Sequence, residues 1–246
     1  LRDRFRLLVR NNRMAEAALV ADRLPEGQGP PSARVLAVAR SPARSLKGPE
    51  VDLRTAAGRE LAIVAFSRLA PEDPKAAVDL WTRMAQTAFP LEDRQYVWAV
   101  LAVQGAYQRI PEAVDWFEKA GDAPLTDEQL AWRARIALRR HRWEEVRTAI
   151  ERMSPTERCE PAWIYWRGRA LAALGRPEEG RKLYARIADR HDFYGRLAAE
   201  ELGRPLTVPP TAAPPTVEEL AEAAGNPGLK RALLLHRLGL RSEASQ

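Results

Sequence analysis

A repeat of 34 residues constrains the fold of this chain more than any other feature. Trp98, Trp132 and Trp166 follow one another at this interval, and Val64 lies one interval before the first of them. A period of about 34 residues is typical of antiparallel helix pairs that stack on one another. One such pair cannot bury both of its faces, so its neighbours complete the core and a curved surface results. The spacing therefore predicts an all-α solenoid of helix pairs, curved or ring-shaped, with a concave face.

The residues around the last tryptophan show how one of these pairs is encoded. Pro161 suits the first turn of a helix, where its missing N–H is not needed. Gly175 ends that helix and Pro177 begins the next one, as expected of an antiparallel pair. An aromatic turn, Asp192–Gly195, then leads into a third helix over Arg196–Leu202.

The same alternation of helix and turn extends over most of the chain. The pairs resemble degenerate tetratricopeptide repeats, because Glu179 and Gly180 stand where alanine is usual in that motif. β-Branched residues are sparse and no period-two run occurs, so we expect no sheet. The expected helical segments are 2–24 (broken at Asn11 and Asn12), 32–40, 55–69 with 74–85, 92–120, 127–153 and 161–189, and an irregular segment is expected at 44–51.

A proline-rich stretch divides the sequence near its C-terminal end. Residues 206–216 read LTVPPTAAPPT, which cannot be helical throughout and is typical of an extended linker. Helical patterning resumes after it, with Asn226 as a helix-capping residue and Pro227 as the first helical residue. We therefore predict a helical-repeat domain over residues 1–205, a linker over 206–216 and a second helical segment over 217–246.

Three sequence runs near this boundary resemble a known family. They are Ile164–Leu171 (IYWRGRAL), the following LGRPEEGRKLYARIA and the aromatic-glycine run FYGRLAAEELG. Together they resemble the soluble lytic murein transglycosylases of Gram-negative bacteria. The resemblance implies that residues 1–205 form the ring-shaped, all-helical U-domain of such an enzyme. It also implies that residues 217–246 begin the small helical linker domain that precedes the catalytic domain in that family.

The catalytic residue of that family has no counterpart in this chain. The family acts through one glutamate, usually followed by serine, which protonates the leaving glycosidic oxygen. That glutamate then accepts the proton of the muramic acid 6-hydroxyl, and a 1,6-anhydro ring closes. No glutamate here is followed by serine, so we assign no catalytic residue. We therefore expect a periplasmic, non-catalytic part, inactive alone, which positions peptidoglycan strands and the catalytic domain missing from this chain.

The charge of the chain adds a candidate contact with peptidoglycan. The net charge is +6, and the residues from Thr126 to Arg190 carry fifteen basic and ten acidic side chains. Arg135, Arg139 and Arg142 are expected on one helix face, where they would meet the carboxylates of the peptide stems. The alternative is a solvated outer face, or pairing with the nearby Glu144-Glu145. A nucleic-acid partner rests on net charge alone, and we do not expect one.

The sequence contains no pattern that predicts a metal site, a cofactor site or a membrane span. His141, His191 and His236 lie in separate elements, and Cys159 is the single cysteine, so no zinc-type spacing occurs. No glycine-rich phosphate loop follows a strand pattern, so we expect no cofactor. No apolar run approaches the roughly 20 residues of a membrane span. Residues from Leu1 onward lack the form of a signal peptide, so we expect the chain to begin inside a longer precursor or to have been trimmed.

The tryptophans allow two interpretations. Those at the repeat position could stack on sugar rings, but their regular place beside apolar residues favours packing between helices. Trp81, Trp116 and Trp143 fall on second helices and remain ambiguous. A rival function for the whole chain is a free-standing helical-repeat scaffold that binds a protein partner in its concave groove.

Overall fold

The computed structural model describes residues 1–84, 86–205, 211 and 213–244, and the described part is all-α, without a strand. The predicted fold class is confirmed. The chain divides into two compact units, Leu1–Leu206 and Thr207–Gln246. No helix within the described residues is both long and apolar enough to cross a membrane.

The first unit begins with a small helical group packed around Phe5 and Val35, both fully buried. The turn predicted at Asn11 and Asn12 is confirmed, and Asn12 takes a left-handed backbone conformation there. The segment 44–51 was predicted to be irregular throughout, but its first two residues belong to a short helix that Pro42 begins. The helices are α1 (Arg2–Arg10), α2 (Met14–Ala21), α3 (Ser32–Arg40), α4 (Pro42–Ser45) and α5 (Ala56–Leu69).

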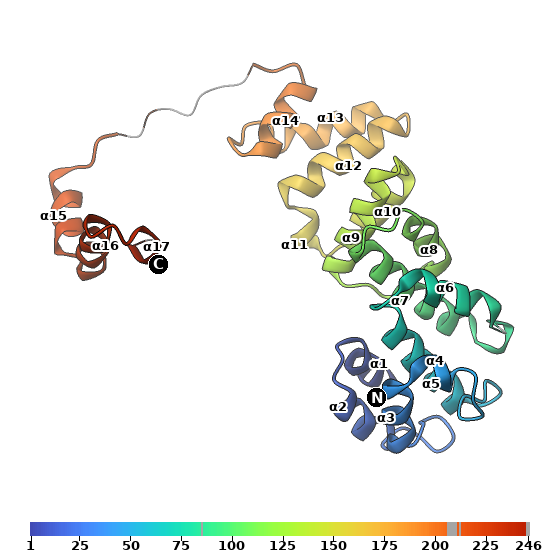
Figure 1. Ribbon diagram of the computed structural model, residues 1–246. Coiled ribbons are helices and arrows are strands. Elements are labelled where there is room, and N and C mark those ends of the chain that lie inside the picture. Colours follow the sequence, from blue (N-terminus) through green and yellow to red (C-terminus); the bar gives the residue numbers. More distant parts are fainter. Residues whose placement is uncertain (85, 206–210, 212, 245–246) are drawn as a thin grey trace. The chain divides into compact units, whose positions relative to one another are not determined.

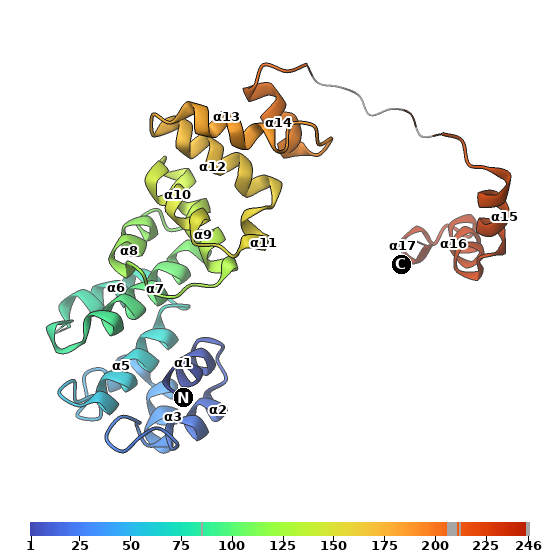
Figure 2. The ribbon, with the colours of Figure 1, turned by 180° about the vertical axis from the view of Figure 1, so that it is seen from behind.

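The middle of the first unit is a stack of helix pairs (Figure 1). The first helices of successive pairs, α5, α7 and α9, pack on one another, and the second helices α6 and α8 pack against α7. Figure 2 shows the same succession from behind. The elements are α6 (Pro74–Arg83), a 3-10 turn (Gln86–Ala88), α7 (Leu91–Tyr107), α8 (Ala113–Ala120), α9 (Asp127–Arg139) and α10 (Trp143–Glu151).

The stack ends with α11 (Pro155–Arg158), α12 (Pro161–Ala173), α13 (Pro177–Ala185) and α14 (Phe193–Glu201). The aromatic turn predicted at Asp192–Gly195 is wrong, because the helix already begins at Phe193. The Asp192 carboxylate accepts the Gly195 N–H at 2.8 Å, and this cap starts the helix earlier than the sequence pattern suggested.

A close approach between α12 and α13 explains the departure from the usual repeat pattern at Gly180. A Cβ placed there would lie 2.7 Å from the carbonyl oxygen of Gly168. A Cβ on Gly168 would in turn lie 2.4 Å from the Tyr184 ring. Glycine at both positions therefore lets the two helices approach more closely than alanine would allow.

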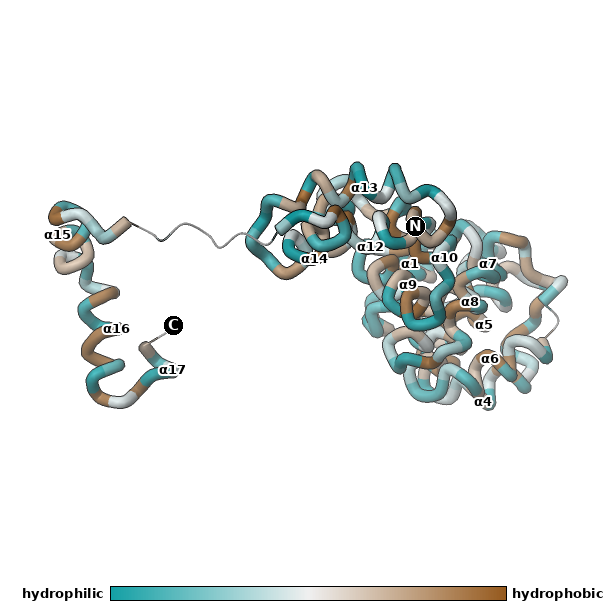
Figure 3. Tube along the Cα trace, turned by 90° about the horizontal axis from the view of Figure 1, so that it is seen from above, coloured by the Kyte–Doolittle hydropathy of each residue, from teal (hydrophilic) through white to brown (hydrophobic). Residues whose placement is uncertain are grey.

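The second unit contains α15 (Val217–Gly225), α16 (Pro227–Arg237) and α17 (Arg241–Ala244). Asn226 caps α16 by accepting the N–H groups of Gly228 and Leu229, as predicted. In Figure 3, apolar and polar positions alternate along α16, and Leu233 and Leu234 are exposed. Of the linker predicted at 206–216, residues 206–210 and 212 lie outside the described part. The predicted domain boundaries remain a prediction.

Candidate binding surface

The structure separates the three arginines that were predicted to share one helix face. Arg135 and Arg139 lie on α9 and are exposed, but α9 ends at Arg139. His141 then takes a left-handed backbone conformation, so Arg142 does not continue the helix and precedes α10 instead. The prediction of a single face is therefore wrong for Arg142.

Arg142 is already engaged by acidic side chains of the neighbouring pair. Its guanidinium contacts Asp115 at 3.3 Å and also pairs with Glu118, both on α8. Pairing of these arginines with Glu144 or Glu145, the alternative considered above, does not occur in the described part of the chain. Those two glutamates pair with other arginines, Arg147 and Arg133.

Arg135 is the arginine of this group best placed to bind an anion. Its guanidinium carbon lies 5.3 Å from the centroid of the Trp132 ring and 5.5 Å from that of Trp163. Stacking on aromatic rings orients a guanidinium while leaving its N–H edges available to a carboxylate. Within the described residues, neither Arg135 nor Arg139 forms an ion pair. Arg135 and Arg139 thus present the unpaired positive charge of α9.

The repeat-position tryptophans are not equally buried. Trp98 lies in the core, as predicted, but Trp132 and Trp166 are only partly buried and pack against its edge. Both rings thus pack on the core, as the repeat predicted, and the Arg135 guanidinium lies over part of the Trp132 ring. The Tyr107 ring meets Trp132 edge-on at 5.5 Å.

The second-helix tryptophans, ambiguous from the sequence, are also resolved by burial. Trp81 is fully buried between Phe66 and Phe89, with ring centroids 5.2 and 5.1 Å away. Trp116 is buried as well, and Trp143 is partly buried against the core. Trp81 and Trp116 are therefore packing residues.

A groove that sequence reasoning missed lies between α1, α7 and the loop that enters α9. It consists of two adjoining hollows of about 210 and 660 Å³ that share Arg10, Tyr96, Pro124, Leu125 and Thr126. We call it the α1–α7 groove. Its signal in the sequence is weak, because its walls come from segments about 90 and 120 residues apart. The remaining lining is Asn11, Ala99, Val100, Val103, Gln104, Tyr107, Glu128 and Gln129 in the smaller hollow, and Asp3, Arg6, Leu7, Glu92, Gln95, Asp122 and Ala123 in the larger.

A buried ionic cluster fixes the wall of this groove. The Arg6 guanidinium donates to Glu60 at 2.6 and 3.0 Å and to Asp93 at 2.6 Å. Arg2 donates to the same two carboxylates at 2.6 Å. Burial alone would lower the pKa of Arg6, but the hydrogen bonds and charges of Glu60 and Asp93 raise it above its ordinary value. The cluster therefore joins α1, which carries the two arginines, to α5 and α7, which carry the two carboxylates.

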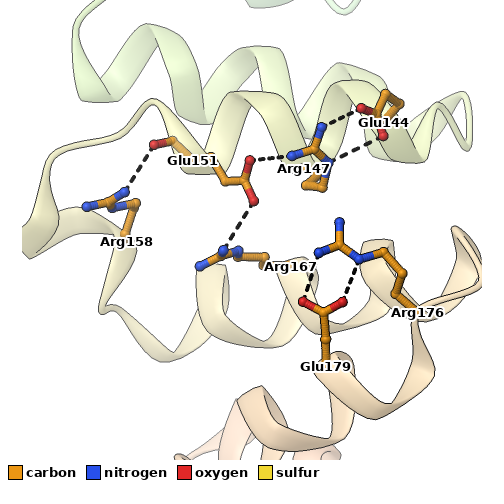
Figure 4. A network of polar contacts seen from close by, with 7 residues as sticks. All are labelled: Glu144, Arg147, Glu151, Arg158, Arg167, Arg176 and Glu179. Atoms are coloured by element: carbon orange, nitrogen blue, oxygen red, sulfur yellow. Dashed lines mark hydrogen bonds and ion pairs between the residues drawn. The ribbon is translucent and has the colours of Figure 1, made fainter.

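A second set of ion pairs lies on the outer surface between α10, α12 and α13 (Figure 4). Glu151 accepts hydrogen bonds from Arg147 and, at 3.1 Å, from Arg167. Arg176 pairs with Glu179 at 2.6 Å. Of the fifteen basic side chains in residues 126–190, eight thus form ion pairs with carboxylates.

The carboxyl groups offer no sign of a general acid. Hydrogen bonds from Arg147 and Arg176 lower the pKa values of Glu144 and Glu179. Among the described residues, each carboxyl group with a resolved pKa shift moves downward, whereas a general acid needs an upward shift. The described residues also contain no cluster of three His, Cys, Asp or Glu side chains that could hold a metal ion.

Comparison with known proteins places the chain beside one group of enzymes. It is 22% identical over 232 residues to the soluble lytic murein transglycosylase of Escherichia coli strain K12, covering 88% of this chain and 34% of that protein. The Salmonella typhimurium protein of the same name is 22% identical over 231 residues, with 87% and 34% covered. The chain thus spans about one third of the length of these relatives. No family model matches.

Solved structures give the same picture for the fold. An inactive mutant of the lytic transglycosylase Slt from Pseudomonas aeruginosa matches with a TM-score of 0.63 at 24% identity, over 98% of this chain and 40% of that one. The 70 kDa soluble lytic transglycosylase of Escherichia coli matches with a TM-score of 0.59 at 20% identity, over 98% and 39%. The resemblance predicted from the sequence is confirmed.

Proposed function

We propose that this chain, a relative of the soluble lytic murein transglycosylases, is the non-catalytic superhelical part of a periplasmic enzyme of that kind. The observation that carries the proposal is the match over 98% of the chain to about two fifths of a solved lytic transglycosylase. In this proposal, residues 1–205 are the U-domain and residues 217–246 begin the linker domain. The parent enzyme cleaves glycan strands of peptidoglycan to 1,6-anhydromuramyl products, with a catalytic glutamate outside this chain.

The role proposed for the helical stack is to hold murein and the catalytic domain in a fixed relation. Stacked helix pairs form one continuous core, so a surface on α7, α9 and α12 keeps its geometry. Arg135 and Arg139 present unpaired guanidinium groups on that stack. Paired N–H donors of an arginine suit the carboxylates of peptide stems. We therefore propose Arg135 and Arg139 as contacts to peptidoglycan, and Arg142 as a weaker one because Asp115 and Glu118 engage it.

An activity assay tests the non-catalytic part of this proposal. The chain is incubated with purified sacculi, and the soluble fraction is analysed by mass spectrometry for anhydromuropeptides. We expect no product above a buffer blank, because no residue of the chain is assigned to acid catalysis. Product above the blank would overturn the non-catalytic role.

A binding assay tests the arginine contacts. The Arg135→Gln/Arg139→Gln double variant is compared with Arg142→Gln in co-sedimentation with sacculi at low salt. We expect the double variant to lose most of its binding and Arg142→Gln to retain most of its own. Equal binding by all variants and the wild type, with the fold intact by circular dichroism, would remove the arginines from the proposal. Binding that instead follows a purified protein partner would favour the scaffold function.

A further inference from the structure

The lining of the α1–α7 groove differs in chemistry from the surface formed by Arg135 and Arg139 on α9, which we call the arginine surface. Three small apolar side chains of α7, Ala99, Val100 and Val103, line its smaller hollow, and Tyr96 and Tyr107 add aromatic rings. We propose that this groove binds an uncharged N-acetylated hexosamine residue of a glycan strand. This inference rests on the proposed function, and it specifies which part of murein the groove would bind.

The polar groups of the smaller hollow suit sugar hydroxyl and amide groups. Asn11, Gln104 and Glu128 line it together with the Arg10 guanidinium. Among the described residues, the Gln104 amide has no hydrogen-bond partner, so its donors and its acceptor are available. Hydroxyl groups both donate and accept hydrogen bonds, so amides, carboxylates and a guanidinium can all engage them. Ligand sites commonly combine such a small polar set with an apolar lining, and the smaller hollow of about 210 Å³ opens into the larger one of about 660 Å³, so that the groove as a whole falls within their usual range of volumes.

The charges around the groove argue against an anionic ligand. Asp3, Glu92 and Asp122 line the larger hollow, and Glu128 lines the smaller one. Arg10 is the one cation of the lining that Glu60 and Asp93 do not engage, since both hold Arg6. Asp122 pairs with Arg152 at 3.9 Å, and the other three carboxylates, which form no ion pair within the described residues, would repel a phosphate or a peptide carboxylate. A neutral sugar ring avoids this repulsion.

The groove continues into the arginine surface through two ring contacts. Tyr107 lines the groove and meets Trp132 edge-on at 5.5 Å, and Arg135 stacks on the Trp132 ring. Neutral and anionic parts of one ligand would thus meet adjoining surfaces of different charge. The sugar would lie in the groove, and an acidic stem would reach Arg135.

A sugar without peptide stems has no carboxylate for the arginine surface, so its binding tests the groove alone. Binding of the tetramer of N-acetylglucosamine to the whole chain is measured by isothermal titration and by NMR of the Gln104 side-chain amide. We expect binding that changes less than twofold between about 10 mM and 0.5 M salt, because no ion pair is involved. Gln104→Trp, which fills the hollow, should weaken the affinity at least tenfold, and Gln104→Ala should weaken it severalfold.

The control uses a residue outside the groove. Gln108→Ala removes an amide just beyond the end of α7 and should bind the tetramer like the wild type. No tetramer binding by the wild type, or wild-type affinity in a folded Gln104→Trp variant, would overturn the groove proposal. If the chain still binds sacculi in either case, the proposed function stands without the groove. If the chain binds the tetramer but not sacculi, the proposed function alone is contradicted.

Discussion

The two ionic clusters of the first unit both pair arginine with carboxylate side chains, but they lie in different surroundings. In the cluster beneath the α1–α7 groove, the Arg6, Glu60 and Asp93 side chains are at most 6% exposed. In the outer network, Arg147, Glu151 and Arg167 are 24–34% exposed. Removing one partner of such an ion pair should therefore have different consequences in the two clusters. A buried partner left alone is an uncompensated charge, whereas an exposed one is taken up by water.

The largest effect is expected from the buried cluster. Glu60→Gln should lower the free energy of unfolding by about 3–5 kcal/mol, because the buried Arg6 guanidinium would lose one of the two carboxylates that offset its burial. Urea denaturation followed by tryptophan fluorescence measures the change. The double variant Arg6→Met/Glu60→Gln should recover part of the loss. A cost below about 1 kcal/mol for Glu60→Gln would mean that the cluster is no more coupled than a surface pair.

The tryptophans extend the comparison of burial to apolar side chains. Trp81→Ala should cost about 3–5 kcal/mol, because the ring is fully buried and its removal leaves a cavity. Trp166→Ala should cost less, about 1.5–3 kcal/mol, because that ring is partly exposed. Chemical denaturation of both variants gives the two values. Equal losses would mean that partial exposure does not reduce the contribution of the repeat-position ring.

The outer network should contribute much less than the buried cluster. Glu151→Gln removes the ion pairs to Arg147 and Arg167, and we expect a cost of about 1 kcal/mol or less. The cost should shrink further at about 0.5 M salt, since exposed pairs are screened. Thermal unfolding at two salt concentrations checks both statements. A salt-independent loss comparable to that of Glu60→Gln would erase the difference between the clusters.

A helix cap provides an effect about as small as that of the outer network, together with a dependence on pH. A hydrogen bond from Arg190 and the Gly195 N–H lower the pKa of Asp192. Because the folded pKa lies below the unfolded one, the cap stabilises the protein above the ordinary Asp value of about 3.9. That contribution is lost as the pH falls through the folded pKa. Asp192→Ala should cost about 1 kcal/mol at neutral pH, and unfolding curves of Asp192→Asn should lack this part of the acid dependence.

The repeat could be predicted from the sequence because it depends on local signals. Each of these signals involves one helix or two neighbouring helices: the 34-residue interval, the Asn12 turn and the Asn226 cap. The structure confirms the all-α stack that they predict. The cap by Asp192 was missed because aromatic residues obscured a helix start that one side-chain hydrogen bond decides.

The groove and the buried cluster could not be predicted in the same way. Arg6 meets Glu60 and Asp93 across 54 and 87 positions, and nothing in the local pattern of α1 specifies those partners. One available signal was Glu60 itself, a charged residue directly before the apolar run Leu61–Phe66. Likewise, the helix-face argument failed at Arg142 because it assumed that α9 continued past His141.

The measurement that tests the central proposal most directly is co-sedimentation of the wild-type chain with purified sacculi at increasing salt. The proposal predicts binding near 10 mM salt that falls as salt rises, because each exposed arginine–carboxylate contact is worth about 1 kcal/mol at most and is screened. Most of the charged contribution should be gone by about 0.5 M salt. A chain that stays in the supernatant at every salt concentration, while folded by circular dichroism, would contradict a role in positioning murein.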